Sequence, residues 1–396
     1  MIFKDLREKF HDLIVAVQQR GGNLIFVGGC VRDILHQETP KDFDAEVYGL
    51  SPKDIQTILA SFGEVKVVGQ TFGVFYSIAL DIEVAIPRRE TKIGKGHRGF
   101  EMAFDPDLSF QEAASRRDLT VNSMGYDPLR EEVLDPWNGQ ADLAQGILRA
   151  TNAEKFGEDP LRSLRVMQFA ARFDMRVDED LKKLCATQDL SELPQERILE
   201  EFRKLLVKGK RPSLGLKFLQ ETNLVRFFPS LHITDALLGW VDKLDVSADK
   251  FPLMLALMTH AAKGLGFLDQ LGVSQKCAKL VSLFHKAYAL LQGDESAYTH
   301  RKIASLFYDR GYAIYSFLAF VGTLGIHPKL LEEMKTHKAF DREKILPIIK
   351  GQHLLEWIPE TPKISFSAIL KKCHEIQLKE GIFERDALWA RFKEIQ

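Results

Sequence analysis

The sequence predicts an α+β protein, in which an N-terminal head with a small mixed sheet and helices is followed by an all-helical neck, body and tail. Strand-like runs are confined to about the first 150 residues, and helical periodicity takes over from about residue 160. The charge also changes sign, because residues 1–150 carry 17 basic and 23 acidic side chains (net −6) and residues 151–396 carry 37 and 32 (net +5). The total of −1 therefore excludes a uniformly basic surface but not a basic rear part that binds nucleic acid.

The elements of the head follow from alternating helix and strand patterns. Residues 3–17 carry apolar side chains at helical spacing, which predicts an opening helix. Residues 24–27 form a short β-rich run that ends in two glycines, and this run predicts the first strand. The elements expected after it are a short helix at 31–35, a strand at 43–48, a helix at 52–62, and strands at 64–68, 74–80 and 82–86.

The rest of the chain is predicted to be helical. Leu161, Leu164, Met167 and Ala171 follow helical spacing, and Leu- and Phe-rich segments separated by breaks such as Phe228-Pro229 continue to the end. We expect three domains, namely a head of residues 1–145, a helical neck of residues 146–230, and a helical body and tail of residues 231–396.

The cysteines and the apolar segments indicate a cytoplasmic protein with no membrane partner. Cys30, Cys185, Cys277 and Cys373 lie far apart and form no CxxC pair, so neither a disulfide framework nor a zinc site is expected. The longest apolar stretch, residues 312–326, is shorter than the roughly 20 residues of a membrane-spanning helix. The opening helix has charges between its apolar positions, unlike a signal peptide.

The first motif is a pair of glycines, Gly28 and Gly29, followed by Arg32 and Asp33. Glycines between a strand and a helix let the backbone approach a ligand closely, and the free N–H groups at a helix start attract anions. A phosphate site and a simple tight turn both remain open as interpretations of this motif.

The second motif is a pair of carboxylates, Asp42 and Asp44, on either side of Phe43. Alternate residues of a strand share a face, so the two carboxylates would lie side by side. Carboxylates that close favour a cation between them, and their hard oxygen atoms suit Mg²⁺. Asp81 and Glu83 repeat the pattern on a later strand, and one of them can complete a site for metal-assisted nucleotidyl transfer. The alternative is a solvated strand face.

The third motif runs from Arg116 and Arg117 through Asp118 to Asn122, and the turn Asp135-Pro136-Trp137-Asn138-Gly139 follows it. The arginines can hold triphosphate oxygens, and Asp118 and Asn122 share a face if the segment is helical and can contact a ribose. A salt-bridged helix start is the alternative.

The fourth motif contains Asp159, Pro160, Arg162 and Arg165 at the start of the first long neck helix. Asp159 is predicted as the N-cap and Pro160 as the first helical residue. A carboxylate and a guanidinium three residues apart also match the amino group and ring nitrogen that cytosine and adenine share, and they mismatch uracil and guanine. Arg165 lies on the same face, where it can reach a phosphate or remain a solvated charge.

Together these motifs resemble the class II tRNA nucleotidyltransferases (CCA-adding enzymes) and the bacterial poly(A) polymerases, in the polymerase β superfamily. The matching residues, in the order typical of the family, are Gly28-Gly29-x-x-Arg32-Asp33, Asp42-x-Asp44, Arg116-Arg117-Asp118-x-x-x-Asn122, Asp135-Pro136-x-x-Gly139 and Glu158-Asp159-x-x-Arg162. The resemblance covers residues 20–205, about half of the chain.

The resemblance implies a role for each matched position. Asp42 and Asp44 would bind Mg²⁺, with Glu83 preferred over Asp81 as the third carboxylate, although Glu46 lies on the same strand face as the first two. Gly28, Gly29 and Arg32 would hold the triphosphate. Arg117, Asp118 and Asn122 would contact sugar and phosphates, and Asp159 and Arg162 would select the base. The segment 88–110 resembles the flexible loop that the family uses when it changes from C to A addition.

The activity that the resemblance implies is addition of C, C and A to the 3′ end of tRNA from CTP and ATP, with Mg²⁺ and without a nucleic-acid template. Basic stretches such as residues 203–211 can contact tRNA phosphates, or form ordinary solvated helix faces. An enzyme that adds only CC or only A, a poly(A) polymerase, and an inactive RNA-binding module that keeps the fold are the alternatives.

Overall fold

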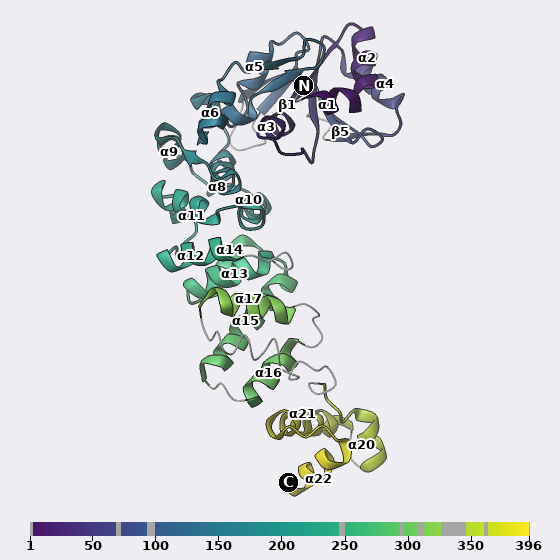
Figure 1. The fold of residues 1–396 in the computed structure, drawn as a ribbon, viewed down its shortest axis with the longest axis vertical. Coiled ribbons are helices and arrows are strands. Elements are labelled where there is room, and N and C mark those ends of the chain that lie inside the picture. Colours follow the sequence, from purple (N-terminus) through teal and green to yellow (C-terminus); the bar gives the residue numbers. More distant parts are fainter. Residues whose placement is uncertain are drawn as a thin grey trace. The chain divides into compact units, whose positions relative to one another are not determined.

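A computed structural model of the chain describes residues 3–68, 73–92, 100–244, 250–293, 297–307, 313–325, 346–359 and 363–395. The chain divides into two compact units, Met1–Phe228 and Pro229–Gln396 (Figure 1). The first unit begins with the predicted sheet and continues as helices, and the described part of the second unit is helical throughout. The α+β class expected from the sequence is confirmed.

The sheet of the first unit has seven strands in the order β3-β4-β5-β2-β1-β8-β9. Strands β2 and β5 pair in parallel and all the other neighbours are antiparallel, so the sheet is mixed as predicted. Strand β1 lies near its middle, and four of its five residues are buried, which explains its uninterrupted apolar run. The strands are β1 (Asn23–Val27), β2 (Asp44–Tyr48), β3 (Val65–Val68), β4 (Val74–Ser77), β5 (Ile82–Ala85), β8 (Gly125–Asp127) and β9 (Glu132–Leu134).

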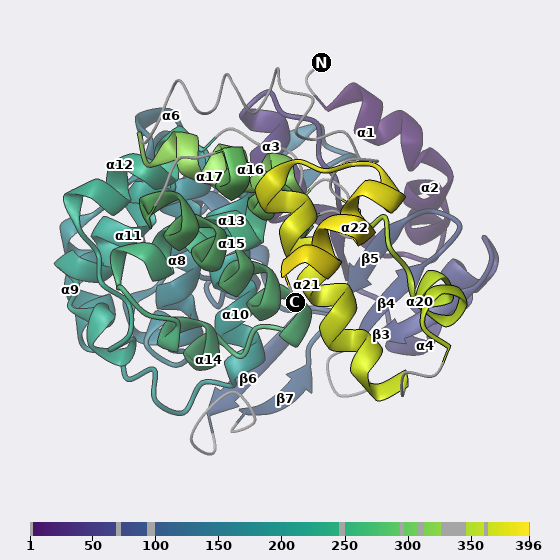
Figure 2. The same cartoon turned by 90° about the horizontal axis from the view of Figure 1, so that it is seen from below.

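The opening helix differs from its prediction, because residues 3–17 do not form one continuous helix. The chain forms α1 (Lys4–Lys9) and α2 (His11–Gln19), with a break at Phe10, whose ψ of 17° is not helical. The Phe10 ring is buried between Phe26 and Phe43, with ring centroids 5.4 and 5.2 Å away. Helix α2 contacts β1 and α4 (Pro52–Ala60), and α4 packs against β3 and β4 (Figures 1 and 2).

The segment 88–110, predicted as a flexible loop, contains regular structure at both ends. Strands β6 (Arg88–Lys92) and β7 (Phe100–Phe104) pair as an antiparallel hairpin, and Ser109 caps α5 (Phe110–Ala114) with a capping box. Residues 93–99, which hold the glycine-rich centre of the predicted loop, lie outside the described residues. Strand β6 lacks a strand pattern because four of its five residues are charged, whereas β7 has apolar residues at alternate positions that the prediction did not use.

The helices that follow surround α8 (Leu161–Phe173), in which ten of 13 residues are buried. Helices α10 (Gln195–Lys208) and α11 (Pro212–Glu221) both pack against it. Strands β10 (Ile147–Leu148) and β11 (Arg176–Val177) form a short parallel pair. The smaller elements of this region are η1 (Thr120–Asn122), α6 (Gly139–Gln145), α7 (Ala153–Phe156), α9 (Glu179–Ala186) and η2 (Leu224–Phe227).

The second unit has a core of leucine, methionine and phenylalanine side chains. Six consecutive residues of α13, from Leu253 to Met258, have no exposed surface. In its described part, as elsewhere in the described chain, no helix is both long enough and apolar enough to span a membrane. The helices are α12 (Asp235–Lys243), α13 (Lys250–Ala261), α14 (Gly266–Leu271), α15 (Gln275–Gly293), α16 (Ala297–Phe307), α17 (Ala313–Thr323), α20 (Gly351–Trp357), α21 (Lys363–Glu380) and α22 (Arg385–Ile395).

Candidate active site

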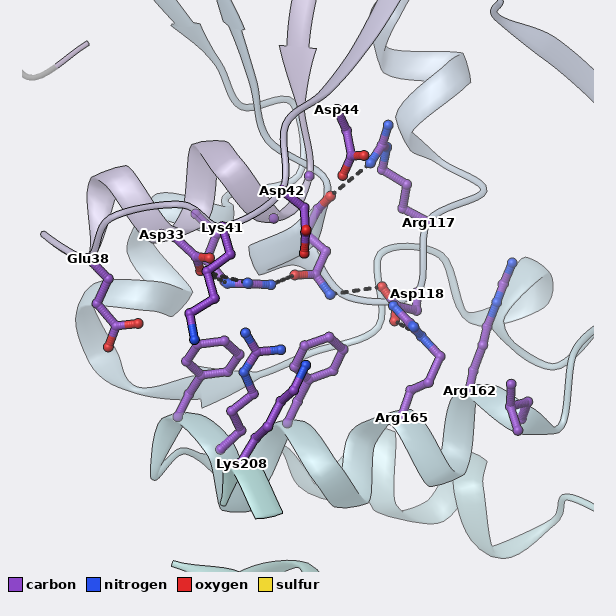
Figure 3. A pocket seen from close by; sticks show the side chains of 18 of the residues that line it. Asp33, Glu38, Lys41, Asp42, Asp44, Arg117, Asp118, Arg162, Arg165 and Lys208 are labelled. Carbon is purple, nitrogen blue, oxygen red and sulfur yellow. Dashed lines mark hydrogen bonds and ion pairs between the residues drawn. The ribbon is translucent and has the colours of Figure 1, made fainter. Parts of the chain in front are cut away.

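One cavity of about 1040 Å³ in the first unit collects most of the candidate residues (Figure 3). Residues from the ends of β1 and β2, from the segment around η1, and from α8 and α10 line it. Four candidates are absent from its lining, namely Glu83, Asp81 and Glu46, which were considered for the third carboxylate, and Arg116. The candidates that line it are Gly28, Gly29, Arg32, Asp42, Asp44, Arg117, Asp118, Asn122, Asp159, Arg162 and Arg165.

The carboxylates lie at the start of β2. Asp42 precedes the strand and is exposed, whereas Asp44 is its first residue and is half-buried. Glu83 on β5 is the register partner of Asp44. Burial, followed by the negative charge of Glu83, raises the pKa of Asp44 from 3.8 to about 6. Asp81 precedes β5, and its side chain accepts a hydrogen bond from the Tyr76 hydroxyl at 2.6 Å.

This carboxylate group fits a divalent cation that also binds a substrate. Within the described residues, no group of three or more His, Cys, Asp or Glu side chains forms a ready-made metal site. Protein sites for Mg²⁺ often supply only one or two carboxylates and leave the other positions to phosphate oxygens and water. Asp42 and Asp44 would fit such a partial site, and a cation there would favour the ionised form of Asp44, which burial and the charge of Glu83 oppose.

Glu46, the third acidic residue of this segment, is committed to a different role. Its carboxylate accepts hydrogen bonds from Arg116 Nη2 and Arg117 Nη2, both at 2.9 Å, and from the Tyr48 hydroxyl at 2.8 Å. The side chain is 1 % exposed. Although burial opposes ionisation, Arg117 and Arg116 hold the pKa of Glu46 below its ordinary value. Glu46 therefore anchors the two arginines and has no oxygen left for a metal.

Gly28 is required by the position of Arg117. Its φ of 73° lies in the left-handed region, and a Cβ there would lie 2.8 Å from Arg117 Nη1. Glu46 thus holds the Arg117 guanidinium against the turn that leads from β1 into α3 (Gly29–Leu35).

Arg32 lies beneath the cavity in a connected polar network. It is 4 % exposed and donates to Asp33 Oδ1 at 2.9 and 2.6 Å and to Asn122 Oδ1. Asn122 Nδ2 donates to Asp118 Oδ1 at 3.0 Å, and Arg165 Nε donates to Asp118 Oδ2 at 2.6 Å. Although burial opposes ionisation, Arg165 holds the pKa of Asp118 below its ordinary value. Three of the five N–H donors of Arg32 are thus bonded to protein groups.

Asp159 and Arg162 line the cavity at the start of α8. Asp159 Oδ1 accepts the backbone N–H of Leu161 at 3.1 Å, but the N-cap is Pro160, one residue later than predicted. Arg162 donates to the carbonyl oxygens of Lys155 and, at 2.6 Å, Arg116. Its backbone contacts orient the guanidinium relative to the third motif.

Several lining residues had no role in the sequence prediction. Arg197 of α10 forms an ion pair with Asp159 at 3.3 Å. Phe169, Arg172 and Phe173 line the cavity from α8, and Lys208 lines it from the end of α10. The helical spacing from Arg165 to Phe169 and Arg172 is a signal for two of these residues, whereas Arg197 and Lys208 are brought in by tertiary packing.

Two protein-family comparisons agree with this geometry. Residues 24–149 match the family described as "Poly A polymerase head domain". This match covers about a third of the chain, which is therefore similar to the head domain of that family. Residues 174–234 match a second family, described as "Probable RNA and SrmB- binding site of polymerase A". The first match contains the carboxylates and the network around Arg32, and the second contains Arg197 and Lys208.

Curated relatives extend the similarity over the head and part of the helical region. A "Multifunctional CCA protein" of Paraburkholderia phytofirmans is 33 % identical over 254 residues, which cover 61 % of this chain and 60 % of that protein. One of Laribacter hongkongensis is 36 % identical over 248 residues, covering 61 % and 58 %. The match thus spans about three fifths of the length of these relatives.

Solved structures share the fold over almost the whole chain. The Bacillus stearothermophilus CCA-adding enzyme, solved in complex with CTP, matches with a TM-score of 0.75 and 22 % identity, over 98 % of this chain and 97 % of that chain. The Thermotoga maritima CCA-adding enzyme, solved in complex with tRNA, matches with a TM-score of 0.69 and 21 % identity, over 99 % and 95 %. The chain therefore has the fold of the CCA-adding enzymes.

Proposed function

We propose that this protein is a CCA-adding tRNA nucleotidyltransferase that adds C, C and A to the 3′ end of tRNA from CTP and ATP, without a nucleic-acid template. The observation that carries the proposal is the joint lining of one cavity by the Asp42 and Asp44 carboxylates and by Asp159 and Arg162. The first pair suits a metal-bound triphosphate and the second suits the base edge that C and A share. The CCA proteins among the relatives support the same activity.

The reaction joins the 3′-oxygen of the RNA to the α-phosphorus of the nucleotide and breaks the bond from that phosphorus to the oxygen of the leaving pyrophosphate. Nucleotidyltransferases of this type use a divalent metal, and Mg²⁺ held here would activate the hydroxyl and neutralise the charge of the phosphates. Asp42 and Asp44 would hold the ion, and Glu83, the register partner of Asp44, remains our choice for a third carboxylate. Gly28 and Gly29 would let the backbone approach the phosphates.

Base selection is assigned to the start of α8. Asp159 would accept from the amino group of C or A, and Arg162 would donate to the ring nitrogen. The ion pair between Asp159 and Arg197 and the two backbone contacts of Arg162 limit the rotation of both side chains. Asp118 and Asn122 would contact the ribose, and Arg117 and Arg165 the phosphates.

The helical remainder would bind the tRNA, and this includes the body and tail from residue 231 onward. The match of residues 174–234 to a family described as a probable RNA-binding site supports this assignment for the neck. The cytoplasmic location stays a prediction from the sequence, and the described cysteines form no disulfide. The family descriptions name polymerase A, so a poly(A) polymerase is the second candidate.

The test is incorporation into a tRNA that ends at the discriminator base, with CTP, ATP, UTP and GTP offered singly and together, followed by sequencing of the product ends. With CTP and ATP together we expect ends of CCA, and with CTP alone we expect addition to stop at CC. With both nucleotides present, ends of CC, a single A or a poly(A) tail would identify the partial enzymes or a poly(A) polymerase. Binding of tRNA without incorporation, with several divalent metals, would identify an inactive RNA-binding module.

The metal assignment has its own test. Asp42→Ala and Asp44→Ala should each lower the rate of incorporation by at least about a hundredfold, because each removes a ligand of the metal that stabilises the transition state. Tyr76→Phe is a suitable control, because it only removes the hydrogen bond to Asp81. Full activity of both alanine variants would contradict the assignment.

A further inference from the structure

The sequence predicted that Arg32 holds the triphosphate, but in the structure the cations best placed for the outer phosphates are other residues of the cavity. All the hydrogen bonds of Arg32 go to Asp33 and Asn122, and its guanidinium lies 4.4 Å from the ring centroid of Phe173. The side chain is 4 % exposed. This buried guanidinium, with three of its five N–H donors bonded to Asp33 and Asn122, positions Asn122 and has few donors left for the outer phosphates of a nucleotide. Further cations line the cavity.

Three other cations reach the same cavity from separate elements. Lys41 precedes β2, Arg172 lies in the last turn of α8, and Lys208 is the last residue of α10. Within the described residues, neither Lys41 nor Lys208 forms an ion pair or a hydrogen bond through its side chain, and Arg172 stacks on Phe173 at 5.0 Å while its charge contributes to the lowered pKa of Glu38. Glu38, the acidic residue beside them, is paired with Lys210 at 2.8 Å. The cluster therefore presents positive charge that the described protein groups do not neutralise.

The position of the cluster relative to the carboxylates indicates its ligand. In Figure 3, Lys41 lies to the left of Asp42 and Lys208 lies below it, whereas Arg165 and Arg162 lie to the right. A nucleotide with its base at Arg162 and its α-phosphate at the carboxylates would point its β- and γ-phosphates toward the lysines. In an in-line displacement the attacking RNA hydroxyl approaches from the side opposite to the leaving group. The lysine side therefore suits the pyrophosphate rather than the RNA.

We propose that Lys41, Arg172 and Lys208 form the subsite for the β- and γ-phosphates of the incoming nucleotide and for the pyrophosphate that leaves. This inference rests on the proposed function and deepens it. It assigns the neutralisation of the outer phosphates to residues outside the matched motifs, and it leaves Arg32 as a positioning residue for Asn122.

The test compares the binding of CTP, CDP and CMP to the full chain by calorimetry, with Mg²⁺ and without RNA. The wild-type protein should bind CTP more tightly than CMP. In Lys41→Gln/Lys208→Gln and in Arg172→Gln the affinity for CTP should fall about tenfold, as expected for the loss of charged hydrogen bonds, whereas the affinity for CMP stays within about twofold. Inorganic pyrophosphate should lose potency as a product inhibitor by the same factor as CTP. Arg172→Lys should recover part of the loss because it keeps the charge.

The matched control is Lys217→Gln, which removes an exposed charge from α11 outside the cavity and should leave all three affinities unchanged. An equal loss for CTP and CMP, or weaker tRNA binding with an unchanged ratio of CTP to CMP affinity, would overturn the subsite. So would wild-type protein that binds CTP and CMP equally. If the variants behave as expected but the wild-type protein adds no nucleotide to tRNA, the subsite stands and the proposed function fails.

Discussion

Asp44 and Glu46 lie on the same strand, but their pKa values are shifted in opposite directions. They are two positions apart on β2, yet burial and Glu83 raise the pKa of Asp44, whereas Arg117 and Arg116 lower that of Glu46. Glu46 is the more buried of the two, so burial alone does not decide the direction. The guanidinium groups of Arg117 and Arg116 determine the direction of the pKa shift at Glu46. The strand thereby keeps one carboxylate with uncompensated charge beside a cavity and uses the other to position the arginines.

Asp44→Asn should stabilise the metal-free protein at high pH and not at low pH. The pKa of the folded carboxyl is raised from 3.8 to about 6, so ionisation opposes folding, and the stability contributed by Asp44 is lost as the pH rises from about 4 to 6. At pH 8 in EDTA, urea unfolding should show the variant about 2 kcal/mol more stable, and the difference should become small near pH 4. Asp42→Asn, at an exposed position, is the control and should have little effect. A variant less stable than wild type at pH 8 would contradict the prediction.

Glu46→Gln should destabilise the protein much more than Tyr48→Phe does. The first change removes the negative charge that Glu46 supplies to two partly buried guanidinium groups and should cost about 3 kcal/mol of the free energy of unfolding. The second removes one hydrogen bond from a neutral hydroxyl to the same carboxylate, which corresponds to about 1.5 kcal/mol. Urea unfolding measures both, and CTP binding should weaken only in Glu46→Gln because Arg117 is then released. Equal costs for the two variants would show that Glu46 does not hold the arginines.

The sequence predicted that the three acidic residues of β2 and its start share one strand face, but it did not predict which residues they pair with. Period-2 alternation placed Asp42, Asp44 and Glu46 together, and it left Glu46 as a possible metal ligand. The arginines that exclude this role are 70 and 71 residues away in the chain, and no local pattern connects them to β2. Likewise, the spacing of Asp159 and Arg162 indicated that they are neighbours, but Arg197 is 38 residues away from Asp159 and joins it only by packing of α10 on α8.

At the scale of elements, the crossing of α8 and α11 depends on a small residue. A Cβ at Gly215 of α11 would lie 2.6 Å from the carbonyl oxygen of Met167 on α8 and 2.4 Å from a methyl group of Leu205. Glycine is unfavourable inside a helix, so its presence here reflects the close approach of the two helices. This crossing supports the helix that carries Arg162 and Arg165 and that begins just after Asp159.

Gly215→Ala should therefore destabilise the protein, against the usual effect of such a change. In an unhindered helix the replacement stabilises by up to about 1 kcal/mol. Here it should cost about 2 kcal/mol, because helices in a packed core have to separate to admit a methyl group. Gly239→Ala in α12 is the matched control, since no neighbouring atom lies within 4 Å of the place that its new methyl group would occupy, and it should be stabilising. Urea unfolding of both variants checks the opposite signs.

The elements could be predicted where one pattern dominates. The first strand, expected at 24–27, is β1 at Asn23–Val27, because it is buried on both faces and uninterrupted. The break at Phe10 was not predicted, because its ring satisfies the helical apolar pattern while its backbone leaves the helix. Strands β8 and β9, of three residues each, are too short for alternation to be recognised.

At the scale of the whole chain, the cavity belongs to one unit only. Among the residues that the structure describes, those that line it fall between Gly28 and Lys210, within Met1–Phe228. The net charges of −6 before residue 151 and +5 after it do not follow this division, because basic lining residues such as Arg172 and Lys208 lie in the later part of the first unit. The count of charges by sequence segment therefore predicted an acidic front part and a basic rear part of the chain. It did not predict that cations and carboxylates line the same cavity.

CTP should stabilise the first unit and leave the second unchanged. In calorimetric unfolding of the full chain we expect two transitions, and CTP with Mg²⁺ at about 100 times its dissociation constant should add about 2.7 kcal/mol to one of them. For a unit of this size that corresponds to a rise of about 6 °C, whereas the other transition should move by less than about 1 °C. Leu257→Ala, at a fully buried position of α13, assigns the transitions, since it should lower only the one that CTP does not move. A CTP-dependent rise of both transitions, or of the one lowered by Leu257→Ala, would contradict the placement of the nucleotide site in the first unit alone.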